Sequence, residues 1–207
     1  MNLRSTVVVG ALVLAGCSSS KVLIPPRVDL ARYGTIGMIE FSSPTPDLSH
    51  QVSKEFLGAV QSAQPGTAVL ELGDQNKLLT EFRAQAIDAE TIRTIGARYH
   101  VDAIMVGVLG AQETKPHLKV ESPLQSPSID ASATLQGALD ARLFDAHSGA
   151  TVWSTSAHAE EPLARVSVSG GGLSGIGAKD PDEAKARLVR GLVDRATMDF
   201  WSHWERQ

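Results

Sequence analysis

Cys17 is the only cysteine in this 207-residue sequence, and its side chain is the clearest candidate for covalent chemistry. A single thiol excludes an intrachain disulfide and a cysteine-based metal site. It can still supply a nucleophile to which another group is attached. Its neighbours therefore decide its chemistry: Leu14-Ala15-Gly16 stand immediately before it, and Ser18 stands immediately after it.

The segment before Cys17 is typical of a secretory signal peptide. A short basic start that ends at Arg4 precedes a mostly apolar stretch, residues 5–14, which is shorter than the roughly 20 residues of a membrane-spanning helix. Leu14-Ala15-Gly16-Cys17 resembles the lipobox of bacterial lipoproteins at every position. The alternative is an ordinary secretory peptide with a chance cysteine. We disfavour it because the lone thiol stands where lipid attachment needs one.

The lipobox resemblance implies a defined maturation of the amino terminus. Residues 1–16 would be removed by the signal peptidase that recognises Leu14, Ala15 and Gly16, and Cys17 would carry diacylglycerol on its sulfur and an acyl chain such as palmitate on its new amine. By the sorting rule of these lipoproteins, Ser18 in place of aspartate implies the outer membrane, facing the periplasm. Residues 17–31, which include two prolines, are then expected to be a lipidated tether, and residues 32–207 the periplasmic domain.

Composition bounds what this domain can be. The sequence is 43% hydrophobic and 20% charged, which favours a folded chain with a real core over a disordered one. Its net charge of −4 and the lack of a dense basic tract argue against nucleic acid as a partner.

The apolar pattern predicts an α/β fold. Strands are expected over 35–41, 67–72, 101–109, 129–143 and 151–159, the last two forming a hairpin through a turn at 145–149. Helices are expected over 47–63 and 77–82, from residue 88, and from Asp180 to about Trp204. The order is β-α-β-α-β, then a β-hairpin and a C-terminal helix. This order indicates a single compact domain with helices packed on a mixed sheet.

Two segments are expected to be loops. Residues 112–128 are polar and contain three prolines, and residues 170–177 contain a glycine-rich GGGLSGIG run. Gly170, Gly172 and Gly175 have the spacing of a dinucleotide-binding fingerprint, but the roughly 30 residues after them read as helix and offer no βαβ unit. A loop is therefore the favoured interpretation, and the sequence does not decide whether this loop has a function.

No constellation of residues predicts catalysis. The six histidines form no metal-binding pair of the HExxH type, and turn chemistry explains Asp145 next to His147. We therefore expect no catalytic residue, no metal, no cofactor and no enzymatic activity.

Trp201 and Trp204 allow two interpretations, an aromatic belt at a membrane interface or core packing along the last helix. Core packing is favoured, with Trp204 on the apolar stripe and Trp201 at its edge.

Four segments, in order, resemble the CsgG/LpoB/TolB-N-like superfamily of envelope proteins. They are Ile36–Phe41, Asp74–Phe82, Ile95–Gly107 and Leu139–Trp153, the last with Asp145, Gly149 and Trp153 in the family's hairpin positions. The superfamily includes the curli secretion pore and a lipoprotein activator of a penicillin-binding peptidoglycan synthase. The resemblance implies a protein-binding domain tethered by a lipid, without catalytic residues.

The predicted function is therefore that of a lipid-anchored lipoprotein that engages an envelope or peptidoglycan-synthesis protein. The alternative is a subunit of a CsgG-like secretion pore in the outer membrane. We disfavour the pore because a membrane hairpin needs two strands of about 9–11 residues, for which residues 112–128 are too few and residues 160–179 too rich in glycine. The sequence leaves open the partner, the binding face and any homo-oligomer.

Overall fold

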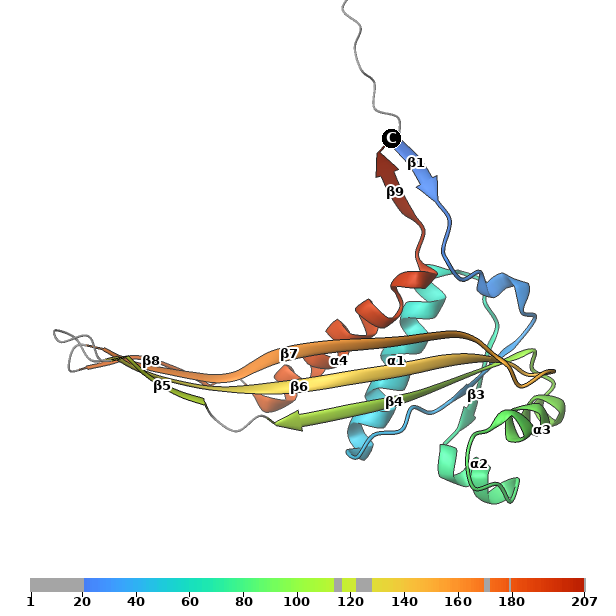
Figure 1. Ribbon diagram of the computed structural model, residues 1–207, viewed down its shortest axis with the longest axis horizontal. Helices are drawn as coiled ribbons and strands as arrows, with labels where there is room; N and C mark the ends of the chain where they lie inside the picture. Colours follow the sequence, from blue (N-terminus) through green and yellow to red (C-terminus); the bar gives the residue numbers. More distant parts are fainter. Residues whose placement is uncertain (1–20, 114–116, 122–127, 170–171, 179, 207) are drawn as a thin grey trace, which may run out of the picture.

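The computed structural model describes residues 21–113, 117–121, 128–169, 172–178 and 180–206. Its centre is a seven-stranded mixed sheet in the order β3-β2-β4-β6-β7-β8, with β5 also paired to β6 (Figure 1). A separate two-stranded sheet joins β1 to β9. The predicted α/β class, with helices packed on a mixed sheet in one domain, is confirmed.

The first half of the chain builds the parallel part of the sheet. β2 (Ile36–Ile39) lies between β3 (Val69–Gly73) and β4 (Ala103–Glu113) and runs parallel to both. Every residue of β2 is buried, as expected of a strand that is covered on both faces. The helices between these strands are α1 (Pro46–Ala63), α2 (Gln75–Glu81) and α3 (Ala89–Tyr99).

Two apolar clusters lie on opposite faces of the sheet. The larger cluster joins α1 and the last helix, α4 (Pro181–Ala196), to strand residues such as Met38 and Met105. The smaller cluster joins α2 and α3 to Ile39 and Ile104. Because successive strand residues point to opposite faces, the neighbours Met38 and Ile39 belong to different clusters. The helices thus cover both faces of the central strands.

The two longest strands extend past the helices. β6 (Ser128–Asp145) and β7 (Thr151–Ser169) pair along almost their whole length, and β5 (His117–Glu121) and β8 (Gly172–Ala178) flank them at the far end. Figure 1 shows these strands as an arm that projects from the domain. The expectation that residues 112–128 and 170–177 are loops is therefore wrong for the described parts of both. Their backbones pair with β6 and β7, and edge strands tolerate glycine-rich and interrupted sequences. The prolines at 116, 123 and 127 and Gly170 lie outside the described residues.

The end of the chain also differs from the prediction. α4 begins at the expected Asp180 cap but ends at Ala196, eight residues before Trp204. A single 3-10 turn, η2 (Met198–Phe200), and the strand β9 (His203–Arg206) follow it. No helix among the described residues is long and apolar enough to cross a membrane.

The expected tether at residues 17–31 is structured in its described part. β1 (Lys21–Ile24) pairs antiparallel with β9, and the 3-10 turn η1 (Leu30–Arg32) buries Leu30 completely in the larger cluster. Backbone pairing with the other end of the chain, which local composition does not encode, causes this difference. The segment without described structure between Cys17 and β1 is therefore only residues 18–20.

Candidate functional site

The residues predicted to direct lipidation, Leu14, Ala15, Gly16, Cys17 and Ser18, lie outside the described residues. The chain enters the described structure at Lys21, the first residue of β1. Lipidation thus stays a prediction from the sequence.

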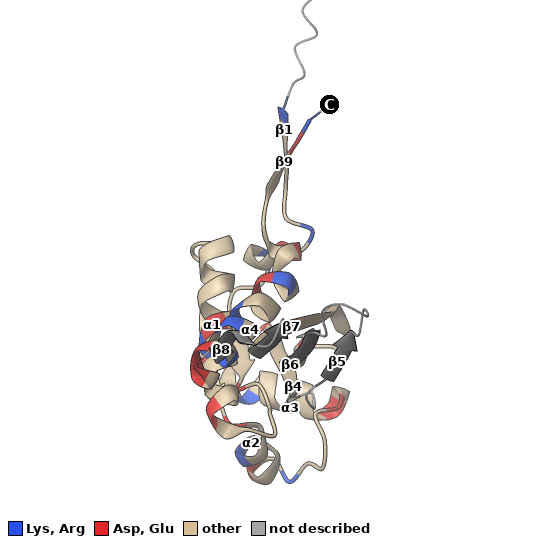
Figure 2. Ribbon diagram, turned by 90° about the vertical axis from the view of Figure 1, so that its left-hand side faces the viewer, with Lys and Arg blue, Asp and Glu red and all other residues tan. Residues whose placement is uncertain are grey.

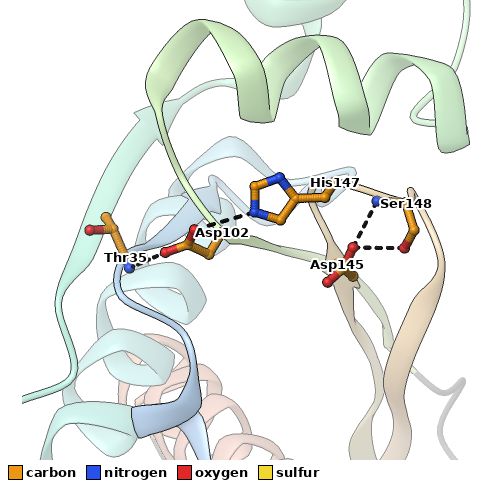
Figure 3. A network of polar contacts seen from close by, with 5 residues as sticks. All are labelled: Thr35, Asp102, Asp145, His147 and Ser148. Carbon is orange, nitrogen blue, oxygen red and sulfur yellow. Dashed lines mark hydrogen bonds and ion pairs between the residues drawn. The ribbon is translucent and has the colours of Figure 1, made fainter.

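Charged side chains meet at one end of the central sheet, where β2 and β4 begin and β6 ends. The register pairs Ala103 of β4 with Asp145 of β6, so Asp102 lies beside the turn that follows Asp145. Figure 3 shows Thr35, Asp102, Asp145, His147 and Ser148 in this cluster. Sequence reasoning singled out Asp145 and His147 but missed Asp102, because only the pairing of β4 with β6 brings it close.

Asp145 closes the turn between β6 and β7. Its Oδ1 accepts hydrogen bonds from the backbone N–H and the hydroxyl of Ser148, both at 2.7 Å. These bonds, the hydroxyl bond first, favour the ionised carboxylate and lower the pKa of Asp145 below its usual 3.8. Gly149 then adopts a φ of +75°, which suits glycine. The structure thus supports the interpretation of Asp145 as a turn residue.

Asp102 joins the starts of two strands. Its Oδ2 accepts the Thr35 N–H at 3.0 Å, and its Oδ1 lies 3.4 Å from Nε2 of His147. The bond from Thr35 is the main reason that the pKa of Asp102 is lowered, and His147 lowers it further. The backbones also pair, since Asp102 N–H donates to the Thr35 carbonyl at 2.8 Å and Ala146 N–H donates to the Asp102 carbonyl at 2.9 Å.

This cluster has the parts of a base with an orienting carboxylate, but among the described residues no hydroxyl or thiol is hydrogen-bonded to His147. The Ser148 hydroxyl donates to Asp145 and not to His147, and the hollow beside it, lined by residues that include Arg32, Tyr33 and Val152, is open to solvent. The cluster also lies at the amino ends of β2 and β4, whereas ligands of open α/β sheets bind at the carboxyl ends of parallel strands. The observed contacts therefore join the starts of β2 and β4 to the turn that follows β6.

The described residues form neither a metal-binding cluster nor a dinucleotide-binding loop. Within the described residues, no group of three His, Cys, Asp or Glu side chains is placed to hold a metal ion. Gly172 and Gly175, from the predicted glycine loop, lie in the strand β8, and the next element is α4. These glycines therefore lie within an antiparallel strand, whereas a dinucleotide fingerprint places them in the loop between a parallel strand and its helix.

The three tryptophans lie in two different environments. Trp153 is buried in the larger cluster, where its ring centroid lies 4.7 Å from that of Phe200 and its Nε1 donates to Asp199 at 3.0 Å. Trp201 is 43% exposed and Trp204, in β9, is 66% exposed. Core packing of Trp201 and Trp204 along the last helix is therefore wrong, since the helix ends before either residue.

Comparisons with known proteins give only distant structural matches. No protein-family model and no curated protein matches the chain. Among solved structures, the PelC dodecamer from Paraburkholderia phytofirmans aligns over 89% of this chain and 99% of its own, with 11% identity and a TM-score of 0.44. Lipoprotein GNA1162 from Neisseria meningitidis aligns over 78% and 96%, with 13% identity and a TM-score of 0.37. The LpoB C-terminal domain from Salmonella enterica aligns over 61% and 83%, with 9% identity and a TM-score of 0.36. At these TM-scores the matches carry no argument, and the proposals below depend on this chain's own residues.

Proposed function

We propose that this chain is a lipoprotein anchored to the periplasmic face of the outer membrane, where its α/β domain binds a protein of the envelope or of peptidoglycan synthesis. The observation that carries the proposal is the Leu14-Ala15-Gly16-Cys17 sequence after a short apolar segment, with Cys17 as the only thiol. Buried acyl chains contribute about 0.8 kcal/mol per CH₂, so several chains on Cys17 would hold the protein at the bilayer.

The character of the described surface supports binding to a protein over conversion of a small molecule. Small-molecule sites are concave, largely apolar and enclosed, with a few convergent polar groups. The hollows around His147 are open, His147 lies within 3.4 Å of Asp102, and Asp145 binds the backbone of the turn. In this proposal the domain is not an enzyme. Its activity is recognition at a distance from the membrane that the anchor sets.

Replacing Cys17 by alanine tests the anchor. Intact-mass measurement and labelling with a palmitate analogue should find acyl chains on the wild-type protein and none on Cys17→Ala, which should leave the outer-membrane fraction. Ser19→Ala is the matched control and should be acylated normally. Acylation of Cys17→Ala, or its retention in the outer membrane, would contradict the proposal. Ser18→Asp tests the sorting signal separately and should move the acylated protein to the inner membrane.

Binding to a partner is tested in cells. Crosslinking of the full-length protein, followed by its purification and mass spectrometry, should recover envelope or peptidoglycan-synthesis proteins. Their yield should fall with Cys17→Ala, because the soluble form is no longer concentrated at the membrane. Recovery of the same background proteins from the wild type and from cells without the protein would contradict a binding function.

A second candidate function, a subunit of a secretion pore, gains support from the arm. The segments predicted to be loops contain β5 and β8. These strands pair antiparallel with β6 and β7, respectively, beyond the helices (Figure 1). Both segments thus contain strands, although β5, with five residues, and β8, with seven, are shorter than the 9–11 residues of a membrane strand. Particle imaging of the detergent-extracted protein separates the two functions, because only the pore predicts closed rings.

A further inference from the structure

Exposed apolar side chains gather at one end of the described molecule. Of the eight large apolar side chains that are exposed among the described residues, five lie in or beside the sheet of β1 and β9. They include Leu23 at 49% exposure and Met198 at 69%, together with Val22, Trp201 and Trp204. Exposed apolar side chains that gather in one place mark sites of contact with proteins or membranes, so this group points to a surface that covers it.

The strands β1 and β9, named here the terminal ribbon, have one face that combines apolar and basic residues. The register places Leu23 opposite Trp204 and Lys21 opposite Arg206. Because residues two apart share a face and opposed residues lie side by side, these four side chains form one surface. Figure 2 shows the basic residues at the free ends of both strands. Like charges that face each other weaken a pair, which favours an anionic group between or beside them.

The base of the terminal ribbon is held by the domain, whereas its free end is not. Gln64, at the end of α1, donates through Nε2 to the carbonyls of Val28 and Phe200 at 2.6 and 3.1 Å and so joins the two chain ends. Val28 N–H also donates to the Asp199 carbonyl at 3.1 Å. Beyond this point every residue of β9 and the first three of β1 are exposed. A two-stranded sheet with both faces in water is only marginally stable, so its free end needs a cover.

The position of Cys17 identifies that cover. Only four residue steps separate Cys17 from Lys21, and an extended chain spans about 3.5 Å per residue, so the Lys21 Cα lies within about 14 Å of the Cys17 Cα, which carries the thiol side chain. We propose that the terminal ribbon docks onto the bilayer surface. Trp204, Leu23 and Trp201 enter the headgroup region, and Lys21 and Arg206 bind lipid phosphates. This inference rests on the proposed lipidation of Cys17.

The chemistry of the face favours a membrane over a second copy of the chain. Tryptophan is enriched at membrane interfaces because its ring is apolar and its N–H is polar, and Lys and Arg near a bilayer are attracted to anionic headgroups. A second copy stacked on the same face would bring four basic side chains together. Anionic phosphates neutralise them, and the apolar side chains between them leave water.

Tryptophan quenching tests the inference on the acylated full-length protein. The protein is inserted into vesicles of phosphatidylethanolamine and phosphatidylglycerol that carry brominated acyl chains, which quench nearby indoles. The wild type should lose the emission of Trp201 and Trp204, while Trp201→Phe/Trp204→Phe should retain the emission of the buried Trp153 unquenched. Strong quenching of the double variant, or no quenching of the acylated wild type, would overturn docking.

The basic residues are tested by leaving out phosphatidylglycerol. Wild-type quenching should fall in vesicles without the anionic lipid, whereas Lys21→Gln/Arg206→Gln should be quenched equally weakly in both. Lys54→Gln/Arg98→Gln removes two exposed charges from α1 and α3 and should behave as the wild type. A wild type that is indifferent to the anionic lipid would overturn the role of Lys21 and Arg206.

The same samples separate the two proposals. Absence of acyl chains from the intact mass would contradict the proposed function, and quenching of unacylated protein mixed with the vesicles would then still decide docking. Acyl chains present without quenching would leave the anchor standing and overturn the ribbon's contact with the bilayer.

Discussion

The central sheet and the terminal ribbon contain similar strands, but the central strands are buried and the strands of the ribbon are exposed. β2 and the adjoining part of β4 are covered on both faces by the helices, whereas all of β9 and most of β1 are exposed. Strand sequence alone does not explain the difference, since β9 carries a tryptophan and β1 carries three apolar residues in four. The burial of a strand therefore depends on whether helices pack against it, as they do on the central strands.

Two adjacent residues show the same contrast at the smallest scale. Phe200 is fully buried between Phe56, at a ring distance of 6.3 Å, and Trp153, whereas Trp201 next to it is exposed. The boundary between the domain and the ribbon therefore falls between these two positions.

Phe200→Ala should cause the largest loss of stability. Removing a fully buried ring leaves a cavity and costs about 3–5 kcal/mol in the free energy of unfolding. Trp201→Ala is the matched control and should cost about 0.5 kcal/mol in water, as is usual for surface positions. Urea unfolding of both variants, followed by circular dichroism, measures the difference. Equal losses would mean that the boundary has been placed wrongly.

Gly149→Ala should have an intermediate effect within the domain. A Cβ at this φ of +75° is strained and would also lie 2.8 Å from the Ala89 Cα at the start of α3, so we expect a loss of about 1–3 kcal/mol. Gly58→Ala is the contrasting variant. Gly58 lies in α1, and a Cβ added there meets no other atom within 4 Å. The alanine variant should therefore stabilise the protein by up to about 1 kcal/mol. Thermal unfolding that moves in the same direction for both variants would refute the account of the turn.

A smaller effect concerns the pH dependence of the domain. The pKa of Asp145 is lower in the folded protein than its usual 3.8, so its contribution to stability is present above pH 3.8 and is lost as the pH falls through the folded value. Asp145→Asn should therefore reduce the fall in the urea midpoint between pH 6 and pH 3. Asp140→Asn removes an exposed charge from the same strand and controls for net charge. An unchanged fall in Asp145→Asn would contradict the role of the Ser148 bonds.

The smallest effect in water should come from Trp204→Ala. Its side chain is 66% exposed, so the free energy of unfolding should change by about 0.5 kcal/mol. The same variant should lose its share of quenching by brominated lipids, which places the function of this residue at the membrane. A loss of stability as large as that of Phe200→Ala would show that the terminal ribbon belongs to the core.

Local patterns predicted the sheet and its helices well. Helix α4 begins at the predicted Asp180 cap, whose side chain accepts the Asp182 N–H, and the alternating segment at 129–143 lies within β6. These features depend on hydrogen bonds and apolar spacing within a few residues, so the sequence shows them directly. The candidate polar cluster was found only in part, because Asp102 and His147 are 45 residues apart and meet only through strand pairing.

The sequence by itself determined the α/β class and the turn at Asp145, and it predicts lipidation of Cys17, because each of these depends on residues that are close together in the sequence. Only the tertiary structure decided that the two ends of the chain pair, that the last helix stops at Ala196 and that Trp204 faces outward. The pairing joins Lys21–Ile24 to His203–Arg206, segments at opposite ends of the sequence. Pairing over such a separation is set by the packing of the domain between them and leaves no periodic pattern in either segment.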